Sequence, residues 1–106
     1  MGAWKSSDGG SISQVGGSSA TGSYTTTTTI VAAGANVRGV IVRTCSMRGV
    51  GASAEGYLTA DGVRLAGLLT NTFFNLTREI FIPSGQALAV ERVAGTLDTH
   101  ITYDIL

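Results

Sequence analysis

The sequence predicts an all-β fold: a jelly-roll-like antiparallel β-sandwich of about seven or eight short strands, preceded by an extended N-terminal arm. Beyond Tyr24, short β-branched runs are interrupted by Gly, Asn, Asp or Pro at the spacing typical of sandwiches and barrels. No segment has the apolar period of a helix. The 106 residues correspond to one domain.

Residues 1–22 are interpreted as the arm, and residues 23–106 as the β-domain. Six Gly and six Ser among the first 22 residues leave no amphipathic period. A flexible tail is one interpretation. The other is an arm that becomes ordered on a neighbouring subunit, with Trp4, Ile12 and Val15 as its apolar anchors.

The β-domain is divided into its expected strands by the positions of its turn residues. A run of five Thr, residues 25–29, lies in the first strand, where Thr suits the pleat; the alternative is a polar ladder between identical strands of neighbouring subunits. The expected strands are 24–32, 37–47, 56–60, 63–69, 72–76, 78–82, 87–93 and 99–105.

Two hairpins are predicted. Asp61-Gly62 favours a two-residue type I′ turn in which Ala60 faces Val63 and Leu58 faces Leu65. The second hairpin turns at residues 83–86, which places Arg78 opposite Glu91.

Both faces of the second hairpin are apolar. Ile80 and Ile82 lie on one face, and Phe81, Leu88 and Val90 on the other. A single core covers one face of an antiparallel hairpin, so the second face is expected to contact another subunit. In the last strand, Ile101, Tyr103 and Ile105 are expected inward, and His100, Thr102 and Asp104 outward.

The charge balance and the cysteine count exclude several classes of function. Seven basic and seven acidic residues give no net charge, so we expect neither nucleic acid nor an anionic membrane as partner. No Cys and His cluster predicts a metal site, no motif predicts a cofactor, and Cys45 is expected to be a small buried thiol. The chain is predicted not to be an enzyme, because His100 is the sole histidine and no nucleophile motif accompanies it.

Three segments, residues 29–47 (TIVAAGANVRGVIVRTCSM), 80–90 (IFIPSGQALAV) and 101–106 (ITYDIL), resemble small accessory proteins of tailed bacteriophage virions. In that family a Thr-rich strand leads into a Gly/Asn turn, and a late hairpin reads I-P-x-G. The resemblance covers residues 25–106. It implies a β-sandwich, repeated copies, no catalytic residues, and attachment to a capsid, collar or tail.

The expected function is therefore that of a non-enzymatic virion protein that is made in the host bacterial cytoplasm. It is expected to decorate or cement other virion proteins as a homo-oligomer, a trimer. The contacts are assigned to Trp4, Ile12 and Val15 of the arm and to one apolar face of the late hairpin. The alternative is a glycan-binding module of a fibre or head spike that recognises a host surface glycan, with Tyr57, Asp61, Asn71 and Asn75 as contacts. A third possibility is a small hydrolase that uses His100.

Overall fold

The computed structural model describes residues 17–69 and 72–106. In these residues seven antiparallel strands form one hydrogen-bonded sheet, which confirms the all-β prediction. One short 3₁₀ turn, η1, spans Ala33–Ala35. The strands are β1 (Ser18–Tyr24), β2 (Thr28–Val31), β3 (Val40–Ala60), β4 (Val63–Leu69), β5 (Phe73–Asn75), β6 (Ile80–Ile82) and β7 (Leu88–Ile105).

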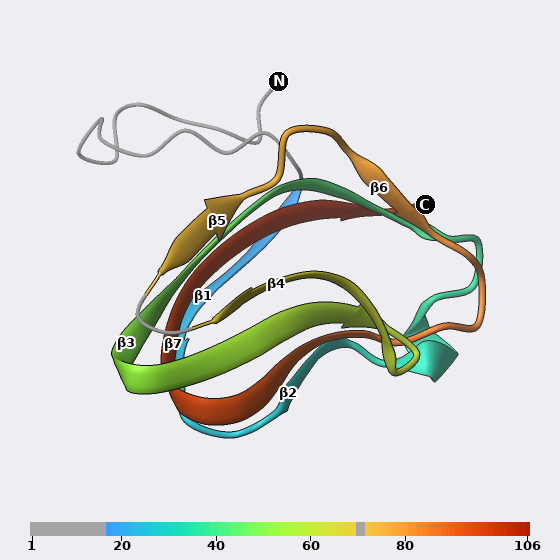
Figure 1. The fold of residues 1–106 in the computed structure, drawn as a ribbon. Helices are drawn as coiled ribbons and strands as arrows, with labels where there is room; N and C mark the ends of the chain where they lie inside the picture. The colour runs from blue at the N-terminus through green and yellow to red at the C-terminus, as the bar shows by residue number, and fades with distance from the viewer. Residues whose placement is uncertain (1–16, 70–71) are drawn as a thin grey trace.

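Two long strands, β3 and β7, pair antiparallel along their length and bend together (Figure 1). The pairing register shifts between Val50 and Glu55, where the bend lies. Opposite this bulge, Gly95 has a φ of 73°. A Cβ at Gly95 would lie 2.8 Å from the Cα of Ala54, so a side chain would collide with the backbone of β3. The bend therefore depends on a glycine in β7.

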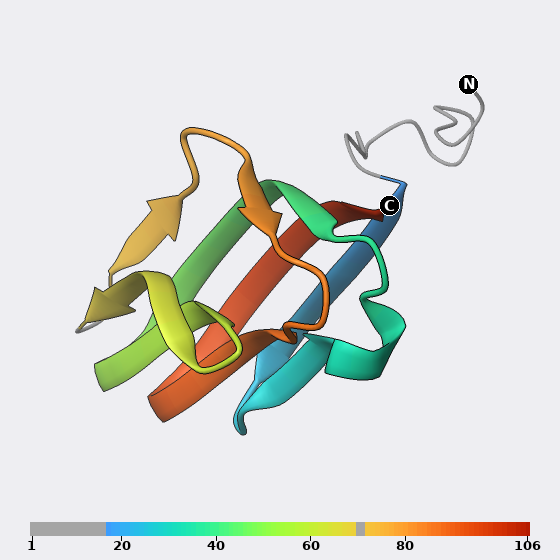
Figure 2. The same ribbon diagram turned by 90° about the vertical axis from the view of Figure 1, so that its right-hand side faces the viewer.

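The bend divides the sheet into two limbs that face each other, as Figure 1 shows. The first limb contains β1, β5 and β6, with residues 40–50 of β3 and 97–105 of β7. The second limb contains β2 and β4, with residues 55–60 of β3 and 88–94 of β7. Figure 2 shows β1, β7 and β3 side by side in the first limb.

The hydrophobic core lies between the two limbs. Its buried members come from β2, β3, β4, β6 and β7, and thus from both limbs, which shows that the bent sheet hides its own concave face. The large apolar side chains that are fully buried are Met47, Leu58, Ile82, Leu88, Leu97, Ile101, Val40, Val42 and Val90.

The first predicted hairpin is confirmed at its turn and shifted further along. Asp61 and Gly62 have φ values of 51° and 84°, as a type I′ turn requires, and Ala60 faces Val63. Leu58 pairs with Ala66, however, because a bulge between Leu58 and Thr59 displaces the register by one residue.

The second predicted hairpin is wrong. β6 pairs with residues 40–42 of β3 in the first limb, whereas residues 88–90 pair with β2 and with the end of β3 in the second limb. The chain therefore crosses from one limb to the other between the two segments instead of folding back on itself. Glu91 faces Tyr57 across the β3–β7 ladder and not Arg78.

Several strand bounds also differ from the prediction. The expected strand 24–32 is divided between β1 and β2, and β3 and β7 each join two expected strands. β1 begins at Ser18, inside the range 1–22 that the sequence assigned to the arm, and pairs with β7. Trp4, Ile12 and Val15 lie outside the described residues.

The alternation expected for the last strand is mostly confirmed. Ile101 is fully buried, and Tyr103 packs against the core. His100 and Asp104 face outward, where both make side-chain hydrogen bonds. Thr102, expected outward, is buried, and its hydroxyl is hydrogen-bonded to that of Thr44 at 2.7 Å. Ile105, expected inward, is 48% exposed at the end of the strand.

Candidate interaction surfaces

The structure separates the residues that the sequence assigned to the subunit contact. Ile82, Leu88 and Val90 are at most 1% exposed in the core of their own chain, so their assignment to a subunit contact is corrected to a core role. Ile80 is half-buried against the same core. Phe81 lies on the outer side of β6 and is 56% exposed. Of the five positions, Phe81 is therefore the one that presents most of its side chain to another molecule.

Phe81 belongs to an apolar patch at the end of the first limb farthest from the bend. Its ring lies against Gly39, where a Cβ would be 2.5 Å from Phe81 Cε1. Phe81 is paired with Ile41, and the amide of Leu106 donates to the carbonyl of Gly39 at 2.9 Å. Val37, which precedes Gly39 by two residues, is 69% exposed. We call Val37, Ile41, Phe81 and Leu106 the free-end patch.

Beside the free-end patch lies an ion-pair cluster. Arg43 Nε donates to Asp104 Oδ2 at 2.7 Å, and its NH1 group donates to Glu79 Oε2 at 2.8 Å. The amide of Gly17 donates to the other oxygen of Asp104 at 2.5 Å. The Gly17 amide, followed by the Arg43 guanidinium, lowers the pKa of Asp104 below its usual 3.8. The cluster forms a charged border on one side of the patch.

Nearer the bend, the outer face of the first limb carries two cross-strand rows of mostly polar side chains. His100 of β7 pairs with Thr21 of β1 and with Ser46 of β3, and Ser46 pairs with Asn75 of β5. The second row is displaced by two residues along each strand. We call the two rows the polar lattice; they are Thr21, His100, Ser46 and Asn75, then Ser23, Asp98, Arg48 and Phe73.

Hydrogen bonds fix the β1 half of the polar lattice. The hydroxyl of Thr21 lies 2.5 Å from His100 Nδ1, and Ser23 Oγ donates to Asp98 Oδ1 at 2.6 Å. Two adjacent hollows of about 320 and 180 Å³ meet over the lattice and share Ser46 and Asp98 in their linings. The lattice therefore forms a shallow open depression on the outer face of the sheet, with polar side chains among its lining.

The outer face of the second limb carries a different cluster around Tyr57. The Tyr57 hydroxyl donates to Glu55 Oε2 at 2.6 Å, and the Arg64 guanidinium lies 3.9 Å from the ring centre. Arg64 also binds both carboxylate oxygens of Glu91, at 3.0 and 3.1 Å. The Tyr57 ring occupies the space in which a Cβ of Gly67 would lie. The polar groups of Tyr57 and Arg64 are therefore already engaged in contacts within the chain.

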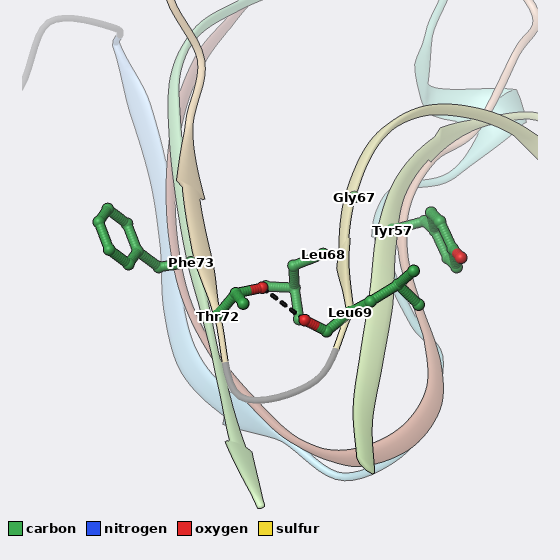
Figure 3. Close-up of a pocket in the computed structure, with 6 residues that line it drawn as sticks. All are labelled: Tyr57, Gly67, Leu68, Leu69, Thr72 and Phe73. Carbon is green, nitrogen blue, oxygen red and sulfur yellow. Dashed lines mark hydrogen bonds between the residues drawn. The ribbon is translucent and has the colours of Figure 1, made fainter. Parts of the chain in front are cut away.

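An open pocket of about 360 Å³ lies between β4 and β5 (Figure 3). Leu68, Leu69 and Thr72 contribute to its lining, and Thr72 Oγ1 donates to the carbonyl of Leu69 at 2.6 Å. In Figure 3 the rings of Tyr57 and Phe73 point away from each other on opposite sides. The pocket therefore cannot hold one ligand between two aromatic faces.

The four residues predicted for glycan contact do not converge. Tyr57 lies on the second limb, and Asp61 is exposed in the turn between β3 and β4. Asn75 lies on the first limb, in the polar lattice. Asn71 lies outside the described residues. The sequence identified Asn75 but missed Ser46 and Arg48, because their neighbours in the lattice are far away along the chain.

Cys45 is buried in the core of the first limb. Burial raises the pKa of its thiol to about 12. Nucleophilic attack requires the thiolate, so Cys45 in the folded chain is suited to packing rather than to covalent chemistry.

Over residues 17–69 and 72–106, no group of three or more Cys, His, Asp or Glu side chains is arranged to hold a metal ion. None of the helices in this part of the chain is long and apolar enough to cross a membrane. Comparisons with protein-family models, curated proteins and solved structures found no match.

Proposed function

We propose that this chain is a non-enzymatic structural subunit of a bacteriophage particle. In this proposal it is a homo-oligomer, a trimer, that decorates or cements capsid, collar or tail proteins. The resemblance of residues 25–106 to virion accessory proteins supplies the setting. The exposure of Phe81 within the free-end patch is the observation that carries the self-association. The bent sheet would serve as a jelly-roll-like sandwich, with the core between its limbs.

The proposed driving force for assembly is burial of the free-end patch. Moving an exposed Phe side chain out of water contributes about 1.5 to 3 kcal/mol to the free energy of association. In a closed ring each copy buries its own Phe81 and so adds its own contribution. Repetition on a particle then adds avidity, so a small contact per copy is sufficient. The ion-pair cluster of Arg43 and Asp104 would form part of the polar rim of the contact.

The arm is proposed to extend this contact. Trp4, Ile12 and Val15, which lie outside the described residues, would bind a neighbouring subunit. Ser18, where β1 begins, pairs with Tyr103 of β7, and Gly17 binds Asp104 beside the free-end patch. Gly17, the first described residue, therefore lies close to the surface that we assign to assembly.

The test compares two variants of the full-length chain at exposed phenylalanines. Phe81→Ser removes the centre of the free-end patch, whereas Phe73→Ser removes a Phe that is 70% exposed elsewhere on the same limb. Analytical ultracentrifugation is expected to show at least about a tenfold weaker association constant for Phe81→Ser, as loss of a buried aromatic contact predicts, and no change for Phe73→Ser.

Equal effects of the two substitutions, or none from Phe81→Ser, would refute the assignment of the contact to the free-end patch. Incorporation of each variant into particles tests the second half of the proposal. Phe81→Ser is expected to be depleted from purified particles relative to Phe73→Ser. Incorporation of Phe81→Ser at the same level as Phe73→Ser would contradict the proposed role in the particle.

A further inference from the structure

The polar lattice on the first limb has an arrangement that packing does not explain. The β7 side of the hollows is supported by hydrogen bonds from β1 to His100 and Asp98. On the β3 and β5 side, Ser46, Arg48 and Asn75 make no side-chain hydrogen bond to any described residue. Donors and acceptors are thus directed to one open depression from fixed backbone positions.

An apolar ring closes one end of this row. Phe73 is paired with Arg48 and is 70% exposed, with its face available to solvent. It lines the same hollow as Ser46, Asn75 and Asp98. An exposed aromatic ring beside amide, carboxylate, guanidinium and hydroxyl groups can stack against the C–H face of a sugar while the polar groups bind its hydroxyls.

The geometry points to a binding site for an uncharged sugar on the polar lattice, with Phe73 as the stacking platform and Ser46, Arg48, Asn75, Asp98 and His100 as the hydrogen-bonding groups. This site is independent of the proposed assembly role. It differs from the predicted glycan site in every residue except Asn75.

The dimensions and charges of the polar lattice indicate which class of ligand it fits. Four adjacent strands at about 4.8 Å spacing, and two rows about 7 Å apart, give an area that fits a mono- or disaccharide. Arg48 and Asp98 are cross-strand partners of opposite charge, so the site has no excess charge to attract an acidic ligand. When Thr21 donates to His100 Nδ1, the Nε2–H group of His100 remains free to donate to a ligand hydroxyl.

The test uses the full-length chain and a panel of methyl glycosides of glucose, galactose, mannose and N-acetylglucosamine, with sialic acid as the charged comparison. Nuclear magnetic resonance titration at millimolar sugar is expected to move the backbone amide signals of residues 46–48, 73–75 and 98–100 with at least one neutral glycoside. Sialic acid is expected to bind at least about tenfold more weakly.

Phe73→Ser and Asp98→Asn are expected to weaken that titration about tenfold or more, because one removes the platform and the other replaces a charged acceptor. Phe81→Ser is the matched control and is expected to leave sugar binding unchanged, since the free-end patch lies outside the lattice. Because oligomer mass is measured separately, a failure of assembly and a failure of sugar binding can be told apart.

Three outcomes would overturn the site. One is the absence of any signal change with all four neutral glycosides. The second is a set of shifts that maps to the Tyr57 cluster on the other limb. The third is binding that survives Phe73→Ser and Asp98→Asn together, with the variant chain shown to be folded by its amide spectrum.

Discussion

A single buried amide joins the loop before β3 to the turn after β6. Asn36 is 2% exposed, and its side-chain nitrogen donates to the carbonyls of Pro83 and Gln86 at 2.7 and 2.9 Å. Its side-chain oxygen accepts from the amide of Gly39 at 2.8 Å. The turn that the sequence predicted at residues 83–86 is therefore held by a residue far away in the chain, which no local turn rule could reveal.

Asn36→Ala is expected to lower the free energy of unfolding by about 2 to 4 kcal/mol. It removes the side-chain partner of the buried Gly39 amide and of the half-buried Gln86 carbonyl, and one of the two hydrogen bonds to the Pro83 carbonyl. Asn75→Ala is the matched control: Asn75 is exposed, and its loss is expected to change stability by no more than about 0.5 kcal/mol. Urea denaturation of the two variants measures both values. Similar denaturation midpoints for the two variants would show that Asn36 does not stabilise the turn at residues 83–86.

Acid should weaken the ion-pair cluster through Asp104. Its pKa is lowered in the folded chain by the Gly17 amide and the Arg43 guanidinium, so its carboxylate stabilises the fold above the usual pKa of 3.8. That contribution is lost as the pH falls through the lowered folded pKa. The unfolding free energy of Asp104→Asn should therefore fall less steeply than that of the wild type below about pH 4. Equal slopes in denaturation at a series of pH values would contradict this.

At the scale of elements, the sequence predicted the strands from local signals and could not predict their partners. The β4 bounds and the Asp61-Gly62 turn are correct because period-two alternation and positive-φ residues are local properties. The β6 and β7 pairing is wrong because adjacent strands were assumed to form a hairpin. Instead, β6 pairs with residues 40–42 of β3, whereas residues 88–90 of β7 pair with residues 58–60 at the other end of β3. The polar lattice was missed for the same reason, since it joins four strands across the sheet.

The bend of β7 offers a direct test at this scale. Gly95→Ala should lower the free energy of unfolding by about 2 to 4 kcal/mol, because alanine disfavours a φ of 73° and its Cβ would collide with the backbone of Ala54. Gly34→Ala is the matched control in the turn η1, where a Cβ meets no atom within 4 Å. It is expected to be neutral or slightly stabilising. Thermal unfolding that shows equal effects would refute the requirement for glycine at the bend.

At the scale of the whole molecule, one continuous sheet hides its concave face and presents its convex face to solvent. The sequence indicated an excess of apolar surface at residues 80–90, and most of that surface proved to be the core: Ile82, Leu88 and Val90 are buried between the limbs. What remains outside is smaller and centred on Phe81. The convex face of the first limb therefore carries an apolar end, which we assign to assembly, and a polar centre, which we assign to a sugar.

The proposed function depends most directly on self-association of the chain. Native mass spectrometry of the full-length wild-type chain at micromolar concentration measures it in one step. We expect a closed oligomer at three times the mass of the 10.8 kDa chain. A spectrum that contains only the monomer would contradict it.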